Sequence, residues 1–283
     1  MAKRRFQAPA RDAVDRSIFE HPAFAPYRFE LDLLSAEHWP DVGTLNARAC
    51  GLKHAQTGAR LRFVDQTAAL LGEGIHYETR IFERGEIPTR ADNWHDLLNA
   101  LVWLRFPQIK SALNARQAAD VLAVGAAQRT RGQCALTHFD EAGAIVRVSD
   151  IHTLALWDAH DWGSLSTRLQ LDSEALDVWV FGHALLEHAL WPEPMLVAKA
   201  IAVLADPEAS ASNLFSRIAD GIAQSELLSD PQQLRPLPTA LIPGWHPRST
   251  EAAFLSEGEC FRPLRMGRVY PRPLTMHTAT PGE

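Results

Sequence analysis

The spacing of apolar residues is most regular in residues 93–106, NWHDLLNALVWLRF. The apolar positions follow the i, i+3, i+4 spacing of one helix face: Trp94, Leu97, Leu98, Leu101, Val102 and Leu104. Asp92 or Asn93 can cap the start of such a helix, and Pro107 ends it. The pattern therefore predicts a helix over residues 93–106, followed at once by a second helix over residues 109–128.

Extended segments and a hairpin are predicted from other patterns. Residues 61–64 (LRFV) predict a strand, and the alternation in residues 75–87 predicts an extended segment. Residues 133–140 and 144–150 predict two strands joined through Glu141-Ala142-Gly143, because Asp140 enters a turn in which Gly143 can take a left-handed conformation.

Further helices are predicted on both sides of that hairpin. The segments are residues 41–53, 152–172, 173–191 (after the cap Ser173), 194–204 and 214–227. Together the elements predict an α+β fold: a mainly helical single domain with a small antiparallel hairpin or sheet. We expect a flexible N-terminal arm (1–28), the globular α+β domain (29–230) and an extended Pro/Arg-rich C-terminal strap (231–283).

Composition narrows the class of protein. The chain has 283 residues, of which 46% are hydrophobic and 22% charged, which is typical of a globular protein with a substantial core. The net charge of −6 disfavours nucleic acid and anionic membranes as partners. No apolar run approaches the ~18 to 20 residues that span a bilayer. Three cysteines without a C-x-x-C pair favour a reducing, cytoplasmic location.

A nucleotide cofactor is not expected. Gly72-Glu73-Gly74 lacks the third glycine of a dinucleotide-binding loop, and the chain has no G-x-x-x-x-G-K-[ST]. Oligomeric state is left open.

The predicted helix over 93–106 carries an unusual number of polar residues. His95 and Asn99 share one helix face, whereas Asp96 points about 100° away from His95. Because a histidine titrates near neutrality, His95 can act as an acid, a base or a metal ligand if a carboxylate orients its other nitrogen. The competing interpretation is that Asn93 and Asp96 cap the helix and that His95 and Asn99 satisfy buried backbone groups.

A second candidate lies in the segment H-x-x-x-E-H, residues 183–188. Histidines five apart on a helix diverge by about 140°, which excludes the inverted zinc-peptidase motif, whose histidines are four apart. His183 and Glu187 do share a face. They can form a carboxylate-oriented histidine, part of a larger metal site, or a buried pair in the core.

Carboxylates at the predicted hairpin turn are the third candidate. Asp140 and Glu141 would stand at the end of a rigid strand, where acid/base groups and metal ligands are well positioned, although turn chemistry alone also explains Asp140. The adjacent His95-Asp96 is also similar to the pair of HD-type metal phosphohydrolases, but these are all-helical and need further ligands that are not evident here.

Arginines in the C-terminal strap interleave with aromatic residues: Arg262, Arg265, Arg268 and Arg272 with Phe261 and Tyr270. Such a segment can bind phosphate or RNA. A strap that forms salt bridges with an acidic body explains the same pattern.

The run N-W-H-D-L-L-N-A-L-V-W-L-R-F-P followed by K-x-x-L-N (residues 93–114) resembles the bacterial family known as domain of unknown function 3025. Further motifs support the resemblance in order: Y-E (77–78), P-T-R (88–90), L-T-x-F-D-E-x-G (136–143), F-G-H-A-L-x-E (181–187), P-G-W-x-P (243–247) and F-R-P-x-R (261–265). The resemblance implies a cytosolic proteobacterial protein. It also implies that the three candidate regions belong to one pattern and converge on one pocket, but it implies no activity.

The sequence therefore leaves two hypotheses. The first is a cytoplasmic hydrolase in which His95, His183, Asp140 and Glu187 are the catalytic groups, acting as acids and bases or with a divalent metal. A small polar or anionic ligand would be positioned by Glu78, Asn93, Asn99, Lys110 and Asn114. The second is a non-catalytic binding or scaffold protein whose polar residues cap helices and tie the hairpin to the core. The enzyme hypothesis requires His95, Asp140 and His183 to share one solvent-accessible pocket.

Overall fold

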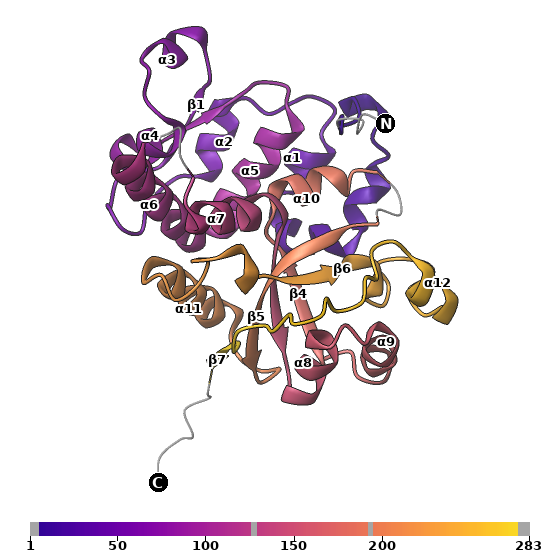
Figure 1. The fold of residues 1–283 in the computed structure, drawn as a ribbon. Helices are drawn as coiled ribbons and strands as arrows, with labels where there is room; N and C mark the ends of the chain where they lie inside the picture. The colour runs from indigo at the N-terminus through magenta and orange to yellow at the C-terminus, as the bar shows by residue number, and fades with distance from the viewer. Residues whose placement is uncertain (1–5, 126–128, 192–194, 277–283) are drawn as a thin grey trace, which may run out of the picture.

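A computed structural model describes residues 6–125, 129–191 and 195–276 of the chain (Figure 1). The α-helices are α1 (Leu31–Ser35), α2 (Val42–Arg48), α3 (Ala68–Gly72), α4 (Tyr77–Arg84), α5 (Trp94–Arg105), α6 (Pro107–Val124), α7 (Arg131–Ala142), α8 (Ile151–Asp158), α9 (Trp162–Leu171), α10 (His183–His188), α11 (Ala211–Ala223) and α12 (Ala252–Glu257). Short 3-10 helices cover Arg11–Ala13, Arg16–Glu20, Pro22–Glu30, Pro231–Gln233 and Thr239–Leu241.

The strands form two sheets. They are β1 (Arg62–Asp65), β2 (Glu86–Thr89), β3 (Gly143–Val148), β4 (Leu176–Val180), β5 (Val197–Ala205), β6 (Arg235–Pro238) and β7 (Leu274–Met276). Strands β1 and β2 form a parallel pair, and the other five form a mixed sheet in the order β4-β3-β5-β6, with β7 also on β5. The α+β class with a small sheet is therefore confirmed.

Strand β3 is the buried centre of the larger sheet. It runs antiparallel to β4, with Ile145 opposite Trp179, and parallel to β5, with Ile145 opposite Ile201. All six residues of β3 are buried, so its sequence is apolar without strict alternation. Helices α4 to α7 and α10 gather beyond one end of this sheet, while α8 and α9 lie near the other (Figure 1). The N-terminal end of β3 therefore lies next to the layer formed by α4 to α7 and α10.

Several predicted elements are confirmed. Asn93 caps α5 by accepting a hydrogen bond from the Asp96 N–H, and α6 follows directly from Pro107. The helices predicted in residues 41–53, 152–172 and 214–227 correspond to α2, to α8 with α9, and to α11; the strand at 61–64 corresponds to β1. Residues 126–128 at the end of the second predicted helix lie outside the described residues.

The predicted hairpin at residues 133–150 is wrong. Residues 131–142 form α7, and the chain then enters β3 directly at Gly143. Thr130 and Gln133 form a capping box that starts the helix, and Ala135, Leu136 and Phe139 bury one face of it. The local turn signal of Asp140 to Gly143 marks a helix C-terminus rather than a hairpin turn.

Three other segments have the opposite secondary structure from the prediction over much of their length. Residues 75–87 form α4 before β2, residues 173–191 contain β4 before α10, and residues 194–204 form β5, with residue 194 outside the described residues. A short, continuously apolar run does not distinguish a buried strand from a buried helix, and the alanines of β5 favour a helix by propensity alone. Burial in the sheet decides the cases of β4 and β5, whereas α4 is delimited by the cap at His76 and the left-handed Gly85.

Both ends of the described chain pack on the body. Phe19, Phe24 and Tyr27 are buried, and the Tyr27 hydroxyl donates a hydrogen bond of 2.8 Å to the Val180 carbonyl. The C-terminal region supplies β6 and β7 to the sheet. The division of the chain at residues 28 and 230 stays a prediction. Within the described residues, no helix is both long and apolar enough to cross a membrane.

Candidate active site

A pocket of about 480 Å³ lies among α4, α5, α7 and α10. Five of the residues singled out from the sequence line it: Glu78, His95, Asn99, Asp140 and His183. Larger cavities of about 580 and 1080 Å³ lie in the C-terminal part of the molecule. The smaller pocket is the better candidate for catalysis, because it alone among these three holds a close cluster of histidine and carboxylate groups.

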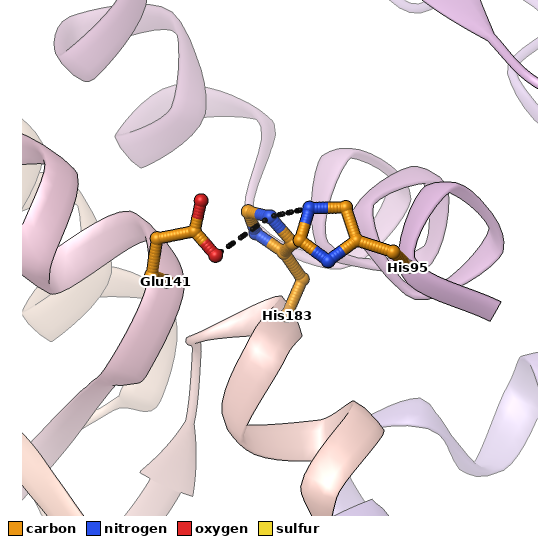
Figure 2. A group of neighbouring side chains, drawn as sticks. All are labelled: His95, Glu141 and His183. Atoms are coloured by element: carbon orange, nitrogen blue, oxygen red, sulfur yellow. Dashed lines mark hydrogen bonds and ion pairs between the residues drawn. The ribbon is translucent and has the colours of Figure 1, made fainter. Parts of the chain in front are cut away.

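Two histidines and a glutamate meet at this pocket (Figure 2). The Nε2 atoms of His95 and His183 are 3.0 Å apart, and His183 Nε2 is 3.5 Å from Glu141 Oε2. One ligand atom from each of the three residues lies within 4.8 Å of the others. Tetrahedral ligands at about 2.0 to 2.2 Å from a metal ion are roughly 3.3 Å from one another, and the separations of 3.0 and 3.5 Å from His183 Nε2 are close to this value.

Two glycines bring Glu141 and His183 together. The N–H groups of Phe181 and Gly182 both donate to the Gly143 carbonyl, each over 2.9 Å. A Cβ on Gly182 would lie 2.4 Å from the Gly143 nitrogen and 2.5 Å from the Ala142 Cα, so only glycine allows this approach. The end of β4 therefore touches the junction of α7 and β3, and His183 begins α10 beside the last turn of α7.

Glu187 orients the His95 ring. Its Oε2 lies 3.1 Å from His95 Nδ1, which leaves Nε2 directed at His183. This hydrogen bond raises the pKa of His95, although partial burial acts in the opposite direction. A carboxylate on the second nitrogen is the arrangement that orients metal-bound histidines, and 30% of the His95 side chain remains exposed.

His183 is held in its neutral form. Burial lowers its pKa to about 3, and the positive charges of Lys110 and His95 act in the same direction. A neutral imidazole keeps a lone pair for a proton or a metal ion. The Glu141 side chain is 42% exposed at the pocket, so the cluster combines a buried ligand with an accessible one.

Asp140 and Lys110 form a buried ion pair behind the cluster. Lys110 Nζ is 2.7 Å from Asp140 Oδ1 and 2.9 Å from Asn99 Oδ1, and Asn99 donates in turn to the Tyr77 hydroxyl over 3.1 Å. Burial raises the pKa of Asp140, but the charge of Lys110 and the hydrogen bond from its ammonium group outweigh this effect, so the pKa is lowered. Asp140 and Asn99 line the pocket, whereas Lys110 supports them from behind.

Glu78 is a second carboxylate on the pocket wall. Asn114 Nδ2 donates to its carboxylate over 2.6 Å and to its backbone carbonyl over 2.9 Å, while Asn114 Oδ1 accepts a hydrogen bond from His54 Nε2 over 3.0 Å. Burial raises the pKa of Glu78 to about 7, with the Asp140 charge acting in the same direction. A carboxyl group that titrates near neutrality is suited to proton transfer.

Four of the residues predicted for the site do not line the pocket: Asn93, Lys110, Asn114 and Glu187. Asn93 caps α5, and Asp96 is bound by the Arg90 side chain with oxygen–nitrogen distances of 2.7 and 3.0 Å. Asn93 therefore caps the helix, as the competing interpretation held, whereas Asp96 forms an ion pair with Arg90 rather than the cap expected there. His95 and Asn99 face the pocket.

Glu141 was named from the sequence beside Asp140 but was not placed among the expected catalytic residues. On the predicted strand the two carboxylates would have pointed to opposite faces; on α7 they diverge by about 100°. Asp140 consequently meets Lys110, whereas Glu141 reaches His183. The capping box formed by Thr130 and Gln133 is the sequence signal that predicts a helix here, and a helix predicts that Asp140 and Glu141 point in different directions.

The fold and the pocket define an α+β protein with a two-histidine, one-glutamate cluster, supported by buried ion pairs. Residues 61–265 match the family model described as protein of unknown function (DUF3025). The chain belongs to this family, which confirms the resemblance found in its motifs. No match was found among curated proteins or solved structures. All pocket-lining residues fall within the matched range.

Proposed function

We propose that the protein is a metal-dependent hydrolase, in which His95, His183 and Glu141 hold one divalent ion. The observation that carries this proposal is the convergence of three donor atoms within 4.8 Å at an accessible pocket. A two-histidine, one-carboxylate donor set suits zinc and similar first-row metals. Three protein ligands also leave a coordination position for water, as catalytic sites require.

Hydrolysis follows from what such a site supplies. A metal of this kind lowers the pKa of bound water toward neutrality and polarises the bond to be broken. Glu78, whose pKa is about 7, would accept or return a proton. Tyr77 and Asn99 would contact a polar substrate, and Arg129, an exposed pocket residue, favours one with a negative charge.

A metal-free role is the second candidate, and one observation favours it. His95 Nε2 and His183 Nε2 face each other at 3.0 Å, a distance that a single shared proton also satisfies. With Glu187 raising the pKa of His95 and burial keeping His183 neutral, His95 would donate that proton. The pair would then tie α5 to α10 without chemistry.

Metal analysis separates the two. The purified protein would be dialysed against zinc or manganese, and bound metal measured by mass spectrometry for wild type, Glu141→Ala, His183→Ala and the control His152→Ala, whose side chain is exposed on α8. We expect one bound equivalent in wild type and His152→Ala and loss in the other two. No bound metal in wild type would reject the metal site.

Activity is measured on the same proteins with chromogenic phosphomonoester, phosphodiester and carboxyl ester substrates. We expect metal-dependent turnover that falls by roughly 100-fold or more in Glu141→Ala and His183→Ala. Metal binding without turnover of any substrate would leave a binding protein rather than a hydrolase.

A cytoplasmic location belongs to this proposal. The three cysteines are free, and Cys50 is exposed, which suits a reducing compartment. Fluorescence microscopy of a tagged chain in its host tests the location.

A further inference from the structure

The largest of the cavities described above lies away from the histidine cluster, beneath the C-terminal segment. It measures about 1080 Å³ and is bounded by β5 and β6 on one side and by residues 259–270 on the other. Figure 1 shows this segment crossing the sheet between α12 and β7. The cavity contains the arginines of the F-R-P-x-R motif, which the proposed hydrolase site does not use.

Four cationic side chains line this cavity; Arg268 donates to the backbone carbonyls of Gln232 and Leu234, and the other three are Lys199, Arg262 and Arg265. Lys199 projects from β5, and Arg262 and Arg265 come from the segment opposite. None of the three forms an ion pair with the described residues; Arg262 Nε donates only to the Glu259 backbone carbonyl, over 3.3 Å. Burial and the charges of Arg265 and Arg262 lower the pKa of Lys199. Glu259 is the one carboxylate residue among the described lining residues.

Lys199 is half-buried and the two arginines are exposed, and their lack of partners contrasts with the buried cations of the molecule. Lys110 pairs with Asp140, Arg80 with Glu86 and Arg235 with Asp158, at 2.6 to 2.7 Å. A half-buried lysine beside two arginines is therefore an uncompensated positive site within a chain of net charge −6. Such a site gains free energy when an anion enters it.

One part of the remaining cavity wall is apolar. Met195, Val197, Leu234 and Pro236 line it, and Met266 is fully exposed at its edge. An inorganic ion would fill only a small part of about 1080 Å³. The wall therefore fits a ligand with an aliphatic part as well as a charged head.

We propose that this cavity binds an amphiphilic organic anion, with a phosphate or carboxylate head at Lys199, Arg262 and Arg265 and an aliphatic part along the apolar wall. Arginine suits either head, because its planar guanidinium can bind two oxygens at once. The proposed site contains none of the residues of the histidine cluster, so a test of anion binding here is independent of the hydrolase proposal.

Calorimetric titration tests the proposal with octyl phosphate, octanoate, octanol and inorganic phosphate, each below its aggregation concentration. We expect wild type to bind octyl phosphate, octanoate or both at least 10-fold more tightly than octanol or inorganic phosphate. The tighter of the two anions identifies the head group. Binding to either anion should weaken as salt is added, because the contacts are ionic.

The double variant Arg262→Gln/Arg265→Gln should lower affinity for the preferred anion at least 10-fold. Arg60→Gln is the control, because Arg60 is exposed and lies outside the cavity. Thermal melting of each variant establishes that it is folded, and Lys199→Met serves as the second variant if the double variant is not. If neither anion binds more tightly than octanol, or if the folded variant keeps wild-type affinity for the preferred anion, the proposal is overturned.

Discussion

The pocket at the histidine cluster (the histidine pocket) differs from the cavity lined by Lys199, Arg262 and Arg265 (the basic cavity) in how its charged side chains are paired. Around the histidine pocket, Lys110 is paired with Asp140, Arg90 with Asp96 and His95 with Glu187. In the basic cavity, Lys199 and the arginines opposite it have no such partners among the described residues. Three ion pairs are thus already formed around the pocket before any ligand arrives, whereas Lys199, Arg262 and Arg265 form none with the described residues.

This difference teaches how each region can work. Paired charges hold side chains in fixed positions, which suits a site where atoms must be placed within a fraction of an ångström. Unpaired cations store an unfavourable energy that a ligand relieves, which suits binding rather than chemistry. The two regions should therefore respond differently when a charge is removed.

The largest expected effect is at Lys110. Replacing it by Met leaves Asp140 without its cation and removes a donor to Asn99, so we expect the free energy of unfolding to fall by about 3 kcal/mol. Urea denaturation measures this. Lys53→Met, at an exposed site, is the control and should change stability by less than about 0.5 kcal/mol.

A double variant sharpens the same prediction. Lys110→Met/Asp140→Leu removes both charges and should recover part of the lost stability, because the cost comes from an unpaired buried carboxylate. If Lys110→Met changes the free energy of unfolding no more than Lys53→Met does, the ion pairs do not stabilise the histidine pocket. The proposed difference between the two regions would then be wrong.

Glu78 gives the next largest effect, as a dependence on pH. Its pKa is raised from 4.5 to about 7 by folding, so the folded chain holds a proton there that the unfolded chain releases between these values. The free energy of unfolding therefore falls as pH rises from 4.5 to 7 and is level above that. We expect Glu78→Gln to remove this loss, which we put at about 2 kcal/mol because the side chain keeps some contact with water.

The measurement is urea denaturation of wild type and Glu78→Gln at pH 5 and pH 8. From pH 5 to pH 8, the free energy of unfolding of Glu78→Gln should rise relative to that of wild type by about 2 kcal/mol. Glu83→Gln, exposed on the same helix, should show no such shift. A constant difference between wild type and Glu78→Gln would show that Glu78 is ionised throughout.

The sequence predicted the local parts of these regions better than their assembly. The cap at Asn93 and the face shared by His95 and Asn99 both depend on helix geometry over a few residues. The partner of Glu187 was not predictable: it orients His95 of another helix, not His183. Long-range pairing of this kind has no signal in a single sequence.

The errors have different physical causes. Residues 197–204 of β5 are buried at most positions, so their apolar run lacks the period that separates a helix from a strand. Residues 133–140 bury one face of α7, and the signal that was missed there is the capping box at Thr130. The error at residues 133–140 also affected the predicted site. On a strand, Asp140 and Glu141 would point to opposite faces and only one of them could reach the pocket. On α7, Asp140 contacts Lys110 and Glu141 lies beside the two histidines.

The smallest expected effect, and the one of opposite sign, is at Lys199. Replacing it by Met keeps most of its volume while removing a half-buried charge that faces Arg262 and Arg265, so we expect the free energy of unfolding to stay level or rise by up to about 1 kcal/mol. Urea denaturation at low salt measures the change, and added salt should reduce it because salt screens the repulsion. A loss of more than 1 kcal/mol would mean that Lys199 has a stabilising partner, and the basic cavity would then resemble the histidine pocket rather than contrast with it.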